Sequence, residues 1–221
     1  MRPLSLLETR VLGVLIEKQH TVPDSYPLSL NALTLGSNQK TAREPVLSAS
    51  DGEVQMAVDA LKGLSLAFDA SGSRVSRYEH NLGRALGLPS QSVALLATLM
   101  LRGPQTTAEL RANSERLHRF ADLSAVEGFL DELASRSADK GGPLVMRLAR
   151  APGSRESRWA HLLAGPVDIA AQPLAESDPE AIVAVSELQA LKARQDVAES
   201  DLADLRRQVE RLYAELGVSR T

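Results

Sequence analysis

The sequence of 221 residues contains no cysteine, which excludes structural disulfides and thiolate metal sites. Aromatic residues make up only 3% of the chain, too few for the stacking surface with which proteins bind single-stranded nucleic acid. No charged segment followed by an apolar core opens the chain, and no apolar run approaches the roughly 20 residues that a membrane span needs. We therefore expect a cytoplasmic protein that does not associate with membranes.

Signatures of catalysis are missing as well. The sequence has no G-x-S-x-G elbow, no phosphate-cradling glycine loop and no dinucleotide fingerprint. None of the 4 histidines has metal-ligand spacing to another histidine or to a carboxylate on one helix. His80 and His161 stand beside aromatic residues at equivalent positions, which predicts hydrogen-bonded or half-buried side chains. We expect a non-enzymatic protein with no cofactor and no metal.

Positive charge is not in excess either. The formal net charge is -3, and residues 164–221 hold 6 Lys+Arg against 11 Asp+Glu, while residues 1–163 hold 19 against 17. Neither part has the strongly basic balance of a typical nucleic-acid-binding domain. The predicted third helices described below are acidic, which argues against ordinary readout of the major groove by these helices.

What the chain does contain is one fold unit in two copies. GSRVSRYEHNL at residues 72–82 and GSRESRWAHLL at residues 153–163 are identical at seven of eleven positions. A glycine turn, arginines and an aromatic strand are the composition of a β-hairpin wing, and helical patterns precede both copies. Three helices followed by such a hairpin is the order of a winged helix, a variant of the helix-turn-helix.

Helix starts in the first copy are marked by capping boxes. Ser5 with Glu8 and Ser50 with Glu53 have the required spacing. The first helix is predicted to end near His20. In the third helix, apolar residues follow the spacing i, i+3, i+4 and i+7 of a buried stripe, at Val54, Ala57, Val58 and Leu61.

Other elements of the first copy are predicted from turn residues and alternation. A short second helix is expected over residues 26–38, with Pro27 near its first turn. Alternation of Leu64, Leu66, Phe68 and Ala70 predicts one strand, and residues 74–80 predict its partner.

The second copy repeats this order with one insertion. We expect helices over residues 90–101, after a cap at Thr106, and after a cap at Ser124. A strand is expected at Leu144, Met146 and Leu148, with its turn at residues 152–153. The buried stripe lies 72 residues after that of the first copy and the wing 81 residues after, so nine extra residues separate them in the second copy. The stripe comprises Val126, Phe129, Leu130 and Leu133.

The motifs of this region resemble a known bacterial family. YPLSLNAL at residues 26–33, NQK at 38–40, RVSRYEH at 74–80, LRGPQT at 101–106 and RWAHL at 158–162 occur in the same order in the YceH-like proteins. The resemblance covers about residues 3–163. It implies a tandem winged-helix fold and no activity, because none is assigned to the family.

Basic residues of the wings and of the loop after the second helix form a candidate nucleic-acid surface. Such residues contact phosphate in architectural DNA-binding proteins. The alternative is that they are solvated or pair with carboxylates such as Glu79 and Glu156. The candidates are Lys40, Arg43, Arg74, Arg77, Arg147, Arg150, Arg155 and Arg158.

The C-terminal part predicts a coiled coil. After a linker with Gly165, Pro166 and Pro173, apolar residues repeat with 3,4 spacing, and charges of opposite sign occupy the flanking positions. Gln195 is a polar residue that would fix a parallel register. The alternative is a helix packed along its own domain. The candidate dimerisation residues are Leu188, Leu191, Gln195, Leu202, Leu205, Val209, Leu212 and Leu216.

The expected fold is therefore mainly α with small β-hairpins, an α+β chain of two winged helices and a coiled coil. Its parts are residues 1–84, 85–163, a linker at 164–178 and a coiled-coil helix at 179–217. The leading functional hypothesis is a homodimeric DNA-associated or regulatory protein that contacts double-stranded DNA through its wings. The alternative is a scaffold that binds a protein partner without DNA. A regulator that senses a small molecule leaves no signature in the sequence.

Overall fold

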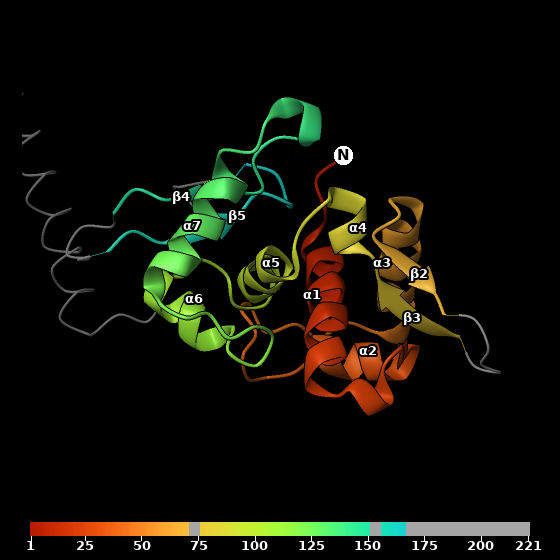
Figure 1. Ribbon diagram of the computed structural model, residues 1–221. Coiled ribbons are helices and arrows are strands. Elements are labelled where there is room, and N and C mark those ends of the chain that lie inside the picture. Colours follow the sequence, from red (N-terminus) through yellow and green to blue (C-terminus); the bar gives the residue numbers. More distant parts are fainter. Residues whose placement is uncertain (71–75, 151–155, 167–221) are drawn as a thin grey trace, which may run out of the picture. The chain divides into compact units, whose positions relative to one another are not determined.

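The computed structural model describes residues 1–70, 76–150 and 156–166. These residues are mainly helical, with small antiparallel sheets (Figure 1). In the first half the elements are α1 (Leu6–Thr21), η1 (Pro23–Ser25), β1 (Leu28–Ser29), α2 (Leu30–Ser37), α3 (Asp51–Gly63), β2 (Ala67–Asp69) and β3 (Arg77–His80).

A short helix, α4 (Leu82–Leu86), connects the halves and has no counterpart in the sequence-based expectations. The second half then repeats the order of helices and strands. Its elements are α5 (Ser90–Arg102), α6 (Thr107–Asn113), α7 (Leu123–Ala134), η2 (Ala138–Lys140), β4 (Val145–Arg147) and β5 (Trp159–His161).

Capping side chains set the helix starts. The boxes of Ser5 with Glu8, Ser50 with Glu53, and Thr106 with Glu109 are all present, which confirms three predicted starts. The predicted cap at Ser124 is wrong. Asp122 caps α7 instead, because its carboxylate accepts from the amide of Ala125 at 2.8 Å.

The second helix also begins later than predicted. Residues Leu28–Ser29 form the strand β1, and α2 starts at Leu30 with Ser29 as its cap. Pro27 lies before this strand and outside the helix. The reason is tertiary: Leu28 pairs with Tyr78 and Ser29 with Arg77, so β3 draws this segment into a sheet.

Both hairpins are shorter than the patterns predict. In the first, Leu66 and Ala67 are both buried whereas Phe68 is 42% exposed, so the expected alternation from Leu64 to Ala70 is wrong. Residues 71–75 and 151–155, which include both predicted wing tips, lie outside the described residues.

The sheets of the two halves have equivalent pairings. The first sheet has the order β1-β3-β2, and the second pairs β4 with β5. An isolated bridge between Gln105 and Trp159 takes the place of the pairing between Leu28 and Tyr78. The segment before α6 therefore meets β5 as the segment before α2 meets β3.

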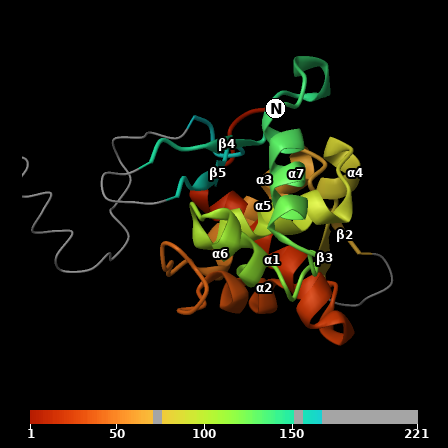
Figure 2. The ribbon, with the colours of Figure 1, turned by 60° about the vertical axis from the view of Figure 1, so that its left-hand side comes forward.

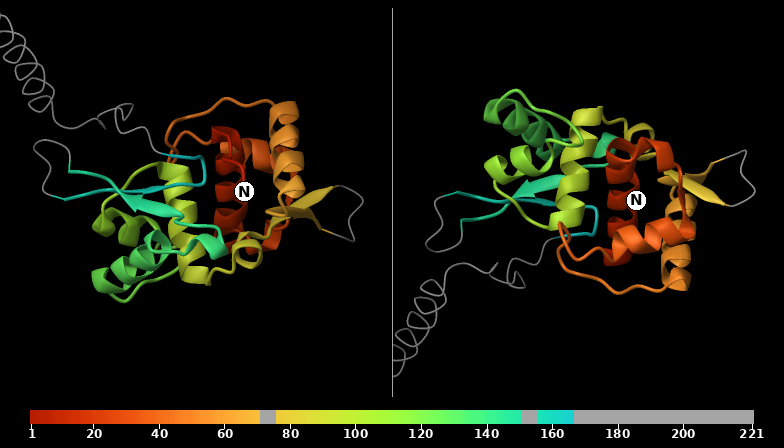
Figure 3. Two further views of the ribbon diagram at one scale, coloured as in Figure 1. Left: turned by 90° about the horizontal axis from the view of Figure 1, so that it is seen from above. Right: turned by 90° about the horizontal axis from the view of Figure 1, so that it is seen from below.

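One continuous core spans both halves. The predicted stripes are confirmed at the seven positions Val54, Ala57, Val58, Leu61, Val126, Leu130 and Leu133, and Phe129 packs against the core while partly buried. The helices α1 and α5 lie side by side between the halves in all views (Figures 2 and 3).

Close approach of α1 and α5 depends on a glycine. A Cβ added at Gly13 would lie 2.9 Å from Leu101 Cδ2, so a larger residue there would push the helices apart. Two backbone hydrogen bonds also cross between the halves, from Leu4 to Leu163 and from Glu44 to Leu101, each at 2.8 Å. Met1–Ile169 form one compact unit, and the predicted boundary between residues 84 and 85 falls inside it.

The predicted coiled-coil helix at 179–217 and the linker beyond residue 166 lie outside the described residues. Among the residues that are described, no helix has the length and apolar character that crossing a membrane requires.

Candidate functional site

The predicted basic surface is dispersed by the structure. Lys40, Arg147 and Arg150 are exposed, Arg77 and Arg158 are partly buried, and Arg43 is buried. Arg74 and Arg155 lie outside the described residues. Arg147 stacks over the Trp159 ring at 5.3 Å and pairs with Glu127 at 3.9 Å.

Arg77 and Arg158 make equivalent internal contacts in the two halves. Arg77 Nη1 donates to the carbonyl of Pro27 at 2.7 Å, and Arg158 Nη1 donates to the carbonyl of Pro104 at 3.1 Å. Arg158 also lies 3.5 Å from a carboxylate oxygen of Glu109. Each arginine therefore fastens a strand to the segment before the second helix of its half, and part of its donor capacity is already used.

Arg43 lies in the interior. Its guanidinium is 0% exposed and makes two hydrogen bonds to the carboxylate of Glu17, at 3.1 and 2.6 Å. Burial alone raises the pKa of Glu17, but the hydrogen bonds and charges of Arg43 and Lys18 outweigh burial and hold it below its ordinary value. Phosphate contact by Arg43 would require this ion pair to open, so Arg43 drops out of the candidate surface.

A second arginine of the core, Arg10, was not predicted. It is fully buried on α1 and donates to the carbonyls of Ser37 at 3.0 Å and Pro45 at 2.6 Å. Burial, then the charge of Arg43, lowers the pKa of Arg10. Arg10 and Arg43 thus hold the loop between α2 and α3 against α1. Nothing in the sequence marks them, because an arginine in a helix is ordinarily solvated.

The exposed faces of α3 and α7 are acidic, as the sequence predicts. Each helix also exposes an apolar side chain. Met56 on α3 is 66% exposed, and Leu123 on α7 is 46% exposed. The exposed carboxylates are Asp51, Glu53 and Asp59 on α3, and Glu127, Asp131 and Glu132 on α7.

A basic segment that the sequence reasoning missed connects α6 to α7. Arg116 and Arg119 in this connection are exposed, as is Arg111 in the last turn of α6. Arg111 donates to the carbonyl of Ala121 at 3.1 Å, and Arg119 lies 4.0 Å from Glu115. The density of arginines in residues 111–119 was the available signal.

His80 and His161 are partly buried, as predicted. The Nε2 atom of His80 lies 2.6 Å from Gln19 Oε1, and burial lowers the pKa of both imidazoles to about 4, with the charge of His20 adding to the effect at His80. Both rings are therefore neutral at pH 7. Across the described residues, no group of three or more His, Asp or Glu side chains is placed to hold a metal.

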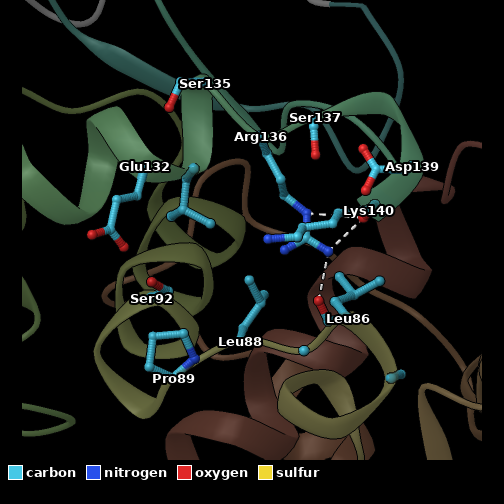
Figure 4. A pocket seen from close by; sticks show the side chains of 13 residues that line it. Leu86, Leu88, Pro89, Ser92, Glu132, Ser135, Arg136, Ser137, Asp139 and Lys140 are labelled. Carbon is cyan, nitrogen blue, oxygen red and sulfur yellow. Dashed lines mark hydrogen bonds between the residues drawn. The ribbon is translucent and has the colours of Figure 1, made fainter.

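A pocket of about 760 Å³ lies between the end of α7 and the connector, which is the segment of residues 82–89 between the two halves. Leu86, Leu88 and Pro89 line one side of it, and the insertion of the second half, with Arg136 and Lys140, lines the other (Figure 4). The Arg136 side chain anchors the insertion: its Nη2 donates to the carbonyl of Leu86 at 2.6 Å, and its Nε to the carbonyl of Lys140 at 3.0 Å.

Comparison with known sequences places these features in a family. The family described as "Protein of unknown function, DUF480" matches residues 4–154. A UPF0502 protein of Methylibium petroleiphilum is 62% identical over 218 residues, which cover 99% of this chain and 92% of that protein. A UPF0502 protein of Leptothrix cholodnii is 59% identical over 220 residues, covering 99% and 97%.

Proposed function

The chain belongs to the DUF480 (UPF0502) family, and we propose that it is a non-enzymatic adaptor that binds a basic protein partner through the exposed faces of α3 and α7. The repeated order of helices and hairpins supports a tandem winged-helix fold for this adaptor. In that fold the third helix is the element presented to a partner. Here both third helices offer exposed carboxylates, and α3 also carries the exposed Met56, so these surfaces suit a basic protein.

The charge of the third helices is the observation that carries the proposal. Exposed carboxylates on α3 and α7 repel phosphate, and association with a duplex depends on neutralising phosphates with Lys and Arg. Meanwhile Arg77 and Arg158 use donors on carbonyls within the protein, and Arg43 is inaccessible. Met56 would act as an apolar anchor, since flexible methionines are common on binding surfaces.

Duplex DNA is the second candidate partner. Several exposed basic residues favour it: Arg111 at the end of α6, Arg116 and Arg119 on the α6–α7 connection, Lys40 and Arg150. Contacts from these residues would be made to phosphate and would position the protein without reading sequence. In either case we propose a homodimer formed by the C-terminal segment, on the sequence pattern alone.

Site-specific photo-crosslinking distinguishes the two partners. A photoreactive amino acid replaces Met56 on α3 or, as the control, Arg84 on α4, which is also exposed but lies outside the acidic face. The adaptor proposal predicts a discrete protein adduct from position 56 that disappears when Asp51 and Asp59 are changed to Lys. Position 84 should give none. Equal labelling from both positions contradicts the proposal.

A salt series on mixed-sequence duplex tests the DNA alternative. If Arg116 and Arg119 contact phosphate, their change to alanine reduces the slope of log K against log salt by about 0.9 for each lost contact. The adaptor proposal expects no measurable binding at physiological salt and no effect of these variants. Tight binding with a reduced slope in the variants would replace the adaptor by a DNA-binding protein.

A further inference from the structure

The pocket at the end of α7 is created by the insertion that distinguishes the second half from the first. Six of the nine extra residues fall between α7 and β4, where the structure forms η2 (Ala138–Lys140), and the other three fall between the paired positions of β4 and β5. Arg136 closes the pocket by bonding to the carbonyl of Leu86 in the connector between the halves. The first half has no such insertion, so a duplicated structural role does not account for the residues that line this space.

We propose that this pocket binds a small molecule that bears a phosphate group. Its volume of about 760 Å³ lies within the range of small-molecule sites. The side chains of Arg136 and Lys140 both extend into the pocket, as Figure 4 shows. Two cations match the double charge of a phosphate monoester at neutral pH.

Neither cation forms an ion pair within the part of the chain that the structure describes. Among the described residues, no carboxylate oxygen lies within 4.0 Å of the Arg136 guanidinium or the Lys140 ammonium, although Glu132 and Asp139 also line the pocket. The hydrogen bonds of Arg136 go to carbonyls, through Nε and Nη2. Its Nη1 is left for a ligand, and a guanidinium fork is well suited to phosphate oxygens.

Two carboxylates, those of Asp139 and Glu132, line the pocket beside the two cations. Hydrogen bonds from Ser137 and from its own backbone, with a contribution from the charge of Arg136, lower the pKa of Asp139, so its carboxylate is ionised and already hydrogen-bonded. In Figure 4 the carboxylate of Glu132 lies across the pocket from Lys140, near α5. Hydroxyl groups on the remainder of the ligand would find acceptors in Glu132 and Asp139. Leu86, Leu88 and Pro89 form an apolar wall on one side of the pocket.

Calorimetric titration of the full-length protein with inorganic phosphate tests the proposal. We expect saturable binding in the millimolar range, since the probe lacks the remainder of the ligand, and no comparable binding of acetate. Lys140→Glu should weaken the phosphate affinity at least tenfold, because it removes one charge-assisted contact and adds a repulsive one. Lys40→Glu makes the same change of charge at an exposed site outside the pocket and should leave the affinity unchanged.

A second variant keeps the outcome decisive. Leu88→Trp fills the pocket without changing its charge and should also abolish phosphate binding, with circular dichroism showing that each variant is folded. Three results would overturn the proposal. They are the absence of saturable binding at phosphate concentrations up to about 50 mM, an equal loss of affinity in Lys40→Glu and Lys140→Glu, and binding of acetate as tightly as phosphate. The proposal shares Glu132 of α7 with the adaptor surface, but its tests change only Lys140 and Leu88, which belong neither to an acidic face nor to a crosslinking position, so the two proposals can fail separately.

Discussion

Replacement of Arg43 by alanine tests whether the interior ion pair supports the whole unit. The Arg43 side chain is 0% exposed, and that of Glu17 is 16% exposed. Besides Glu17, Arg43 bonds to the carbonyl of Gly36 at 3.1 Å and to the side chain of Gln39 at 3.0 Å. Its removal leaves a largely buried carboxylate whose remaining ion pair, among the described residues, is with Lys18 at 3.0 Å.

The expected loss is large for a single substitution. Removal of one partner of a buried pair costs about 3–5 kcal/mol of unfolding free energy, because the other charge remains desolvated. At about 2–4 °C per kcal/mol for a protein of this size, the midpoint of thermal unfolding should fall by about 6–20 °C. The paired change Glu17→Leu with Arg43→Met should restore most of the loss, since well-packed apolar replacements of both partners are often neutral.

Urea unfolding with two probes measures the effect. Trp159 is the single tryptophan, is 3% exposed and lies in the second half. Because one core spans both halves, its fluorescence midpoint should shift with the circular dichroism midpoint in Arg43→Ala. The control is Arg119→Ala, whose ion pair with Glu115 is exposed and should contribute less than about 1 kcal/mol. Equal midpoints for Arg43→Ala and the wild type, or a Trp159 transition that does not move, would refute this reasoning.

Three further expectations concern the core, the pH dependence and the assembly. Leu61→Ala and Leu133→Ala should each lower the unfolding free energy by about 2–5 kcal/mol, and wild-type melting of both variants would contradict the duplicated stripe. Burial lowers the pKa of His80 and His161 from 6.5, the value in the unfolded chain, to about 4 in the folded protein. The contribution of these neutral side chains to stability is therefore complete above about pH 6.5 and is lost as the pH falls toward about 4. Urea midpoints between pH 7.5 and 4.5 measure this decline, and a flat profile over that interval speaks against neutral imidazoles. Deletion of residues 179–221 should convert a dimer into a folded monomer in sedimentation, whereas a dimer that persists would move the interface to the body.

The sequence predicted the features that depend on residues close together in the chain. Capping boxes at Ser5, Ser50 and Thr106 were confirmed because an N-cap side chain bonds an amide only three residues away. The stripe ending at Leu61 was confirmed because helical periodicity determines which side of a helix is apolar. The internal repeat predicted that the second half would have the same helices and strands as the first. The prediction of a buried stripe therefore extended to the residues around Leu133.

Interactions between distant segments decided the rest. Residues 28 and 29 became a strand because β3 pairs with them, against a local pattern that suits a helix. The sequence predicted Arg43 to be a surface cation, but in the folded chain it is buried and pairs with Glu17, which lies 26 residues earlier. The pocket depends on Arg136 meeting the carbonyl of Leu86, 50 residues away. Local periodicity and capping chemistry therefore determined which elements form, whereas the burial of a charge and the shape of a cavity were decided only when chain segments with no sequence proximity packed together.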